Sequence, residues 1–174
     1  MNNKSPITQI LAFVLYVLVQ LVFFRDVWVF NKAYCWIYVT PLLLLPTYTK
    51  DYILLFVAFI LGLSVDVMYD KVGVNAAACV LLAYLRPMVL KMLAGQSTGN
   101  DEVKEFNLKN VGFQSFSVYI LILLFSHHLL LNLINAASSE FIWRAFVKTI
   151  LSVVFTYVII VSTQMLYYTR RSSR

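Results

Sequence analysis

The stretch Leu61-Gly62-Leu63-Ser64-Val65-Asp66-Val67-Met68-Tyr69-Asp70 decides the fold, because a carboxylate interrupts an otherwise apolar run. As a helix, the stretch places Gly62 and Asp66 on one face, four residues apart. An ionised side chain deep in a bilayer costs roughly 2.5 to 3.5 kcal/mol and usually faces the interior of a helix bundle. We therefore expect Asp66 to point toward other helices, and Gly62 to let a neighbouring backbone come close.

Composition predicts an integral membrane protein of the all-α class. The 174-residue chain is 61% hydrophobic and 13% charged, whereas soluble domains contain roughly 25% charged residues. Cys35 and Cys79 lie in separate apolar runs without metal-ligand spacing, so we interpret both as small buried hydrophobic residues and expect no disulfide, metal or cofactor. The net charge of +6 comes from residues at the ends of apolar runs, which is typical of membrane topology and not of a nucleic-acid interface.

Apolar runs predict six transmembrane helices in a single bundle that covers residues 1–174. The predicted spans are 7–24, 33–49, 51–70, 72–90, 113–134 and 149–168. The second span is short and is interrupted by Pro41 and Pro46, so we expect a kink whose freed carbonyls find partners on neighbouring elements. Residues 91–112 form a polar loop, and residues 169–174 form a basic tail.

The distribution of Lys and Arg predicts the orientation in the membrane. With a cytoplasmic N-terminus, nine of the 14 basic residues lie inside and five lie outside. The positive-inside rule therefore favours cytoplasmic termini and a cytoplasmic 91–112 loop.

In this topology Asp66 lies toward the outer face, at nearly the depth of the His127-His128 pair. His128, Asn132 and Asn135 share one helical face at spacings of four and three residues. We predict that Asp66 accepts a hydrogen bond from His128, or from His127, so that Asp66, His128 and Asn132 form a buried structural latch. A solvated outer pocket and a proton or ion relay remain as alternatives. Adjacent histidines on a helix cannot both face one ion, so we expect no metal site.

The fourth span is rich in small residues, which let helix axes approach closely in lipid. Small residues recur at four-residue spacing in two pairs, Gly73 with Ala77 and Cys79 with Ala83. We expect this span at the centre of the bundle. Arg86 marks its exit, where the side chain either extends to the headgroups or binds a carboxylate or lipid phosphate at the inner face.

Together these features resemble the bacterial rod shape-determining protein MreD family. The resemblance covers nearly the whole chain and rests on the six-span plan, the Gly62-Leu63-Ser64-Val65-Asp66 segment, Gly73 at the start of the fourth span, and Tyr84-Leu85-Arg86-Pro87 at its exit. It implies a multi-pass inner-membrane protein of the cell-elongation complex, which makes peptidoglycan, with no catalytic residue and an MreC-like partner. It also implies a fold similar to the six-helix substrate-capture subunit of energy-coupling-factor transporters.

Two functions follow as hypotheses. The leading one is a non-enzymatic scaffold that binds the transmembrane helix of an MreC-like partner through a lipid-facing apolar groove. The alternative is a substrate-capture subunit of an energy-coupling-factor type transporter, with Asp66, His128, Asn132 and Asn135 forming an outward-facing pocket. The first span has no alanine-spaced docking face for a coupling partner, which favours the scaffold. An enzyme is a distant third, since the sequence contains no nucleophile elbow and no phosphate-binding glycine loop.

Overall fold

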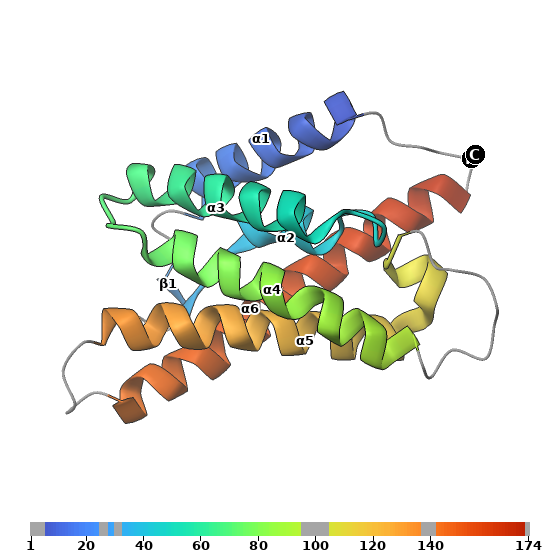
Figure 1. Ribbon diagram of the computed structural model, residues 1–174. Helices are drawn as coiled ribbons and strands as arrows, with labels where there is room; N and C mark the ends of the chain where they lie inside the picture. The colour runs from blue at the N-terminus through green and yellow to red at the C-terminus, as the bar shows by residue number, and fades with distance from the viewer. Residues whose placement is uncertain (1–5, 25–27, 30–32, 95–104, 137–141, 173–174) are drawn as a thin grey trace.

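The computed structural model describes residues 6–24, 28–29, 33–94, 105–136 and 142–172. Five long helices form one bundle (Figure 1): α1 (Pro6–Phe23), α3 (Asp51–Met68), α4 (Val74–Ala94), α5 (Leu108–Asn135) and α6 (Ile142–Ser172). Helix α4 packs between α3 and α5, and α5 also packs against α6. We call the end where α3 turns into α4 the turn end, and the opposite end, where α4 ends and α5 begins, the loop end. Helix α1 begins and α6 ends at the loop end (Figure 1).

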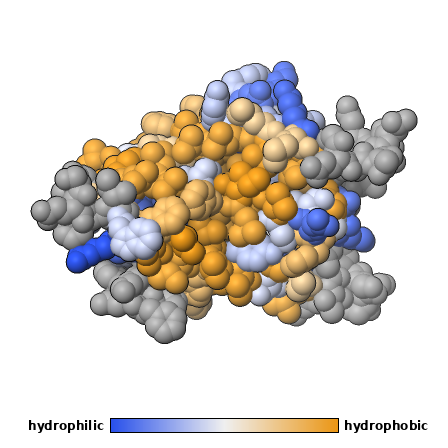
Figure 2. Space-filling view, turned by 90° about the horizontal axis from the view of Figure 1, so that it is seen from below, coloured by the Kyte–Doolittle hydropathy of each residue, from blue (hydrophilic) through white to orange (hydrophobic). Residues whose placement is uncertain are grey.

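The exterior of the bundle is apolar. Four helical stretches are long and apolar enough to cross a membrane: Asp51–Met68, Val74–Leu93, Leu108–Asn135 and Trp143–Leu166. They correspond to the third, fourth, fifth and sixth predicted spans, while the apolar stretch of α1 is shorter. Exposed large hydrophobic side chains occur on all five long helices, and Figure 2 shows one broad hydrophobic face with hydrophilic residues toward its edges. Such an exterior fits a helical membrane protein.

The second predicted span is not a single helix, and this prediction was wrong. After β1 (Trp28–Val29) the chain forms three short elements: β2 (Ala33–Tyr34), the 3₁₀ helix η1 (Ile37–Val39) and α2 (Thr40–Leu43). The two strands pair antiparallel. Pro41 lies at the start of α2, where a missing N–H costs nothing, and Pro46 follows its end and forms an isolated bridge with Glu105. Since a proline disfavours helix at the preceding residue, the interrupted run cannot continue as one helix.

This irregular segment lies inside the bundle, where residues 35–43 are all buried. Backbone groups without helical partners must find others when no water reaches them. Two of them use hydroxyl groups of α6: the Tyr34 N–H donates to Ser152 Oγ at 3.0 Å, and the Trp36 N–H donates to Thr156 Oγ1 at 3.3 Å. Helix α6 therefore completes the hydrogen bonding of the segment from one side.

Gln20 of α1 completes the segment from the other side. Its Oε1 accepts from the Ile37 N–H at 2.8 Å, and its Nε2 donates to the Cys35 carbonyl at 2.9 Å. The same Nε2 lies 3.3 Å from the Tyr69 hydroxyl at the end of α3. One buried amide thus joins α1, the irregular segment and α3.

Helix α5 is bent near its start. Gly112 has φ +77° and ψ 168°, so the first turn is set at an angle to the rest of the helix. Asn107 caps that first turn by accepting a hydrogen bond from the Asn110 N–H at 3.0 Å. Residues 105–110 therefore lie over the loop end, against Pro46.

Candidate functional site

Asp66 is 1% exposed and is bound to the start of α4. Its Oδ1 accepts from the Asn75 N–H and from Asn75 Nδ2, both at 3.0 Å, and its Oδ2 accepts from the Ala76 N–H at 2.9 Å. The first N–H groups of a helix have no intrahelical partner and carry partial positive charge, so they suit a carboxylate. Asp66 therefore caps α4 from α3 and ties the two helices together.

The turn between α3 and α4 brings these groups together. The Lys71 N–H donates to the Asp66 carbonyl at 2.9 Å, while Asp70 has φ +52°, which is the geometry of a Schellman helix ending. Gly73 has φ +74°, and its carbonyl accepts from the Ala77 N–H. A Cβ on Gly73 would meet no atom within 4 Å. Its role is thus conformational, and the predicted packing role of Gly73 was wrong.

The small residues at the contact between α3 and α4 are only partly those expected. A Cβ on Gly62 would lie 2.4 Å from Ala76 Cα and 2.6 Å from Ala76 N, a separation that no side chain can occupy. Cys79 and Ala83 are buried, whereas Ala77 is exposed. The predicted packing role of Ala77 is therefore wrong, because the face of α4 that meets α3 is set by Ala76, one residue earlier.

The predicted hydrogen bond between Asp66 and His128 is not formed. Both carboxylate oxygens are bound to α4, and neither ring nitrogen of the fully buried His128 has a hydrogen-bond partner among the described residues. Asn132 instead donates to Thr149 Oγ1 at 3.0 Å and joins α5 to α6. Asn135, also predicted near Asp66, accepts from Lys71 Nζ at 2.8 Å. Backbone donors of the adjacent helix satisfy the carboxylate, so it does not need an imidazole.

His127 reaches Asp66 indirectly, through a chain of buried side chains that we call the Asp66 chain: His127, Tyr38, Asn75 and Asp66. The Tyr38 hydroxyl donates to Asn75 Oδ1 at 3.2 Å and lies 3.0 Å from His127 Nε2. Because the single hydroxyl proton is given to Asn75, His127 Nε2 carries the proton of its own bond. Cys79 Sγ adds a weak donor to Tyr38 at 3.6 Å. Every donor in the chain is directed toward the carboxylate.

Sequence reasoning missed two members of this chain. Asn75 follows Gly73 in the first turn of the fourth predicted span, and that position could have marked it as a partner for a nearby carboxylate. Tyr38 lies in an apolar, proline-interrupted run and carries no comparable signal.

Arg86 is 1% exposed, and both of its predicted roles at the membrane surface were wrong. Its Nε donates to the Tyr119 hydroxyl at 2.9 Å, and its Nη2 donates to the Leu45 carbonyl. Tyr119 in turn donates to the Leu43 carbonyl at 2.8 Å. These carbonyls lack helical partners because the segment around Pro46 is irregular. The Arg86 side chain points into the bundle, where it donates to one of these carbonyls directly and contacts the tyrosine that donates to the other.

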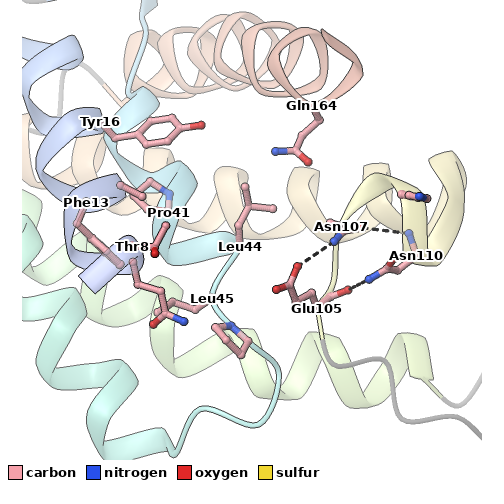
Figure 3. Close-up of a pocket in the computed structure, with 14 residues that line it drawn as sticks. Thr8, Phe13, Tyr16, Pro41, Leu44, Leu45, Glu105, Asn107, Asn110 and Gln164 are labelled. Atoms are coloured by element: carbon pink, nitrogen blue, oxygen red, sulfur yellow. Dashed lines mark hydrogen bonds between the residues drawn. The ribbon is translucent and has the colours of Figure 1, made fainter. Parts of the chain in front are cut away.

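The described residues also surround a cavity of about 490 Å³. It lies at the loop end between α1, residues 41–46, residues 105–110 and α6 (Figure 3). None of the residues predicted for an outer pocket lines it, since Asp66 and His128 lie toward the turn end. Among the described residues, no group of three His, Cys, Asp or Glu side chains could hold a metal ion.

Comparisons with protein-family models, with curated proteins and with solved structures give no match. Function is therefore inferred from the residues and the geometry of the chain.

Proposed function

We propose that this chain is a non-enzymatic membrane scaffold of the bacterial cell-elongation complex, which binds an MreC-like partner and supports rod shape. The resemblance to the MreD family suggests this role. The observation that carries it is the state of the buried charges: among the described residues, Asp66 and Arg86 are both hydrogen-bonded to groups of the chain itself. A charge held in this way stabilises the bundle and is closed to a substrate.

In this proposal the chain crosses the inner membrane six times, with both termini in the cytoplasm. Five crossings are the long helices. The second crossing is the irregular segment, which starts beside Ser152 of α6 and reaches Glu105 at the loop end. Irregular backbone is tolerated at membrane depth where protein buries it, as it is here. The count of basic residues, nine against five, favours a cytoplasmic loop end.

The partner contributes a transmembrane helix that packs on the apolar exterior. Hydrophobic burial gives little drive between helices in lipid, so close packing and hydrogen bonds supply the affinity. A bundle held rigid from within by Asp66 and Arg86 presents such a surface in one fixed shape, which reduces the ordering cost of binding.

Co-purification and cell shape test the proposal together. The tagged chain, solubilised in a mild detergent, should retain an MreC-like membrane protein, and deletion of its gene should round the cells. Asp66→Ala should reduce the amount of protein in the membrane and the fraction of rod-shaped cells in parallel. Asp51→Ala, which removes an exposed carboxylate at the start of α3, should change neither. Absence of any such partner, with rod shape unaffected by deletion, would contradict the proposal.

The cavity at the loop end favours ligand binding and so bears on the substrate-capture alternative. In the proposed orientation, however, this cavity lies on the cytoplasmic side, whereas capture from outside requires an outward opening. The residues that formed the predicted outer pocket are engaged elsewhere: Asp66 with α4, and Asn132 with Thr149. A proton relay is also disfavoured, because the amide of Asn75 interrupts the Asp66 chain and does not readily release a proton. The scaffold is therefore the function we propose.

A further inference from the structure

The cavity at the loop end has the size and the mixed lining of a small-ligand site. Its volume of about 490 Å³ falls within the roughly 300 to 1,000 Å³ of known ligand pockets. Phe13 of α1 and Leu44 after α2 give it apolar walls, and polar side chains enter from α1, α6 and residues 105–110 (Figure 3).

One buried polar side chain in this cavity has no partner among the residues that the structure describes. Gln164 of α6 is 7% exposed, and its side chain extends into the cavity (Figure 3). Within the described part of the chain it forms no hydrogen bond, so one acceptor and two donor positions are unused. Tyr16 extends from α1 toward the same space, and its hydroxyl is likewise unpaired among the described residues. The Gln164 amide and the Tyr16 hydroxyl therefore offer hydrogen-bonding groups to a molecule in the cavity.

Two opposite charges line the cavity without pairing with each other. Glu105 is half-buried, and among the described residues its Oε2 accepts one hydrogen bond, from Asn107 Nδ2 at 3.3 Å. Lys109 also lines the cavity, and no ion pair joins it to Glu105 or to any other described residue. The half-buried Glu105 and the exposed Lys109 thus place one negative and one positive group at the cavity, an arrangement complementary to a zwitterion.

We propose that this cavity binds the headgroup of a phospholipid that carries a primary amine. The ammonium donates to Glu105 and to Gln164 Oε1, while the phosphate accepts from the Tyr16 hydroxyl and lies near Lys109. A lipid is favoured over a soluble zwitterion because α1 and α6, which form two walls, expose apolar side chains to the surroundings, such as Ile10 and Leu166. The acyl chains lie along that apolar exterior. This inference does not depend on the MreC-like partner.

Native mass spectrometry of the purified full-length chain in detergent tests the proposal. Phosphatidylethanolamine, phosphatidylcholine and phosphatidylglycerol are added singly at equal concentration, and glycerophosphoethanolamine serves as the headgroup without tails. Phosphatidylethanolamine should be retained roughly tenfold more strongly than the other two lipids, because only its ammonium donates hydrogen bonds while its phosphate still meets Lys109. Equal retention of the three lipids, or binding of the headgroup alone as tightly as the lipid, would overturn the proposal.

Two variants locate the binding. Gln164→Leu and the isosteric Glu105→Gln should each weaken phosphatidylethanolamine retention roughly tenfold. The matched controls are Gln114→Leu and Asp51→Asn, which alter an exposed amide and an exposed carboxylate outside the cavity and should leave retention unchanged. Thermal unfolding curves show whether each cavity variant is folded. If a folded cavity variant retains the lipid as strongly as the unaltered chain, the lipid does not bind in this cavity. The function proposal is tested without added lipid, so the two can fail separately.

Discussion

Two glutamines in long helices of the bundle show how the two ends of this molecule differ. Gln20 of α1 and Gln164 of α6 are both more than nine-tenths buried. Gln20 satisfies the backbone at Cys35 and Ile37, whereas Gln164 forms no hydrogen bond in the part of the chain that the structure describes. The same type of side chain, buried in both places, completes the backbone hydrogen bonding in one and faces an open cavity in the other.

This difference teaches that burial alone does not identify a functional residue in a membrane bundle. The Asp66 chain and Gln20 are parts of the scaffold, since their polar atoms replace water for a helix start and for an irregular segment. Polar groups that face the cavity at the loop end, such as Gln164 and Tyr16, have no hydrogen-bond partner among the described residues. His128 also lacks one but lies closed off among packed side chains toward the turn end. Two observations together, the lack of a partner and a position on the cavity wall, separate Gln164 from the structural residue Gln20.

The largest expected effect is at Asp66, at the turn end. Asp66→Ala leaves two helix-start N–H groups and the amide of Asn75 without acceptors, and it should cost about 3 kcal/mol or more of unfolding free energy. Unfolding of the purified protein in detergent measures this loss. The exposed Asp51→Ala should change stability by less than about 0.5 kcal/mol. Equal stability of both variants would mean that the hydrogen bonds of Asp66 are not structural.

Arg86 sharpens the comparison, because it is a buried structural residue by its hydrogen bonds and yet binds Leu45, a residue that lines the loop-end cavity. If its hydrogen bonds and not its position decide its role, Arg86→Met should destabilise the bundle by about 2 to 3 kcal/mol, since a buried carbonyl loses a charged donor. Arg86→Lys should recover part of the loss. Unchanged unfolding of Arg86→Met, combined with altered lipid retention, would assign Arg86 to the cavity instead.

A smaller effect is expected at the contact between α3 and α4. Gly62→Ala forces a shift because its Cβ would lie 2.4 Å from Ala76 Cα, and overpacking of this kind costs about 1 to 3 kcal/mol. Ala77→Leu, on the exposed face of α4, should cost less than about 0.5 kcal/mol. Comparison of the two melting curves in one detergent checks both values. A larger loss for Ala77→Leu would show that the outer face of α4 carries a contact of its own.

The sequence predicted the features that depend on hydrophobic pattern. Long apolar runs gave the helices α3 to α6, and a glycine one turn before a carboxylate marked a close backbone approach. The need for partners to the carbonyls around Pro46 also followed from proline chemistry, and Arg86 and Tyr119 meet it.

The remaining features depend on which residue of a neighbouring helix faces each side chain. The hydrophobic periodicity of the sequence does not contain that information. Asp66 was paired with His128 because both are polar and lie at a similar depth, yet backbone N–H groups are present at every residue and leave no mark in the sequence. Prolines interrupt the second span, and the Trp36 and Ile37 N–H groups find partners on α6 and α1 that a linear pattern cannot reveal. The cavity follows from the packing of α1 and α6 around residues 41–46, and Gln164 itself looks like any isolated polar residue in an apolar run.

The most direct measurement is the unfolding free energy of two matched variants in lipid-free detergent. Gln20→Leu should lose about 2 to 4 kcal/mol, because the Ile37 N–H and the Cys35 carbonyl lose their partner inside the bundle. Gln164→Leu should be as stable as the unaltered chain, or about 1 kcal/mol more stable, since an unpaired buried amide is replaced by an apolar group. Equal destabilisation by the two substitutions would contradict the account, in which Gln20 is a structural residue and Gln164 belongs to a binding site.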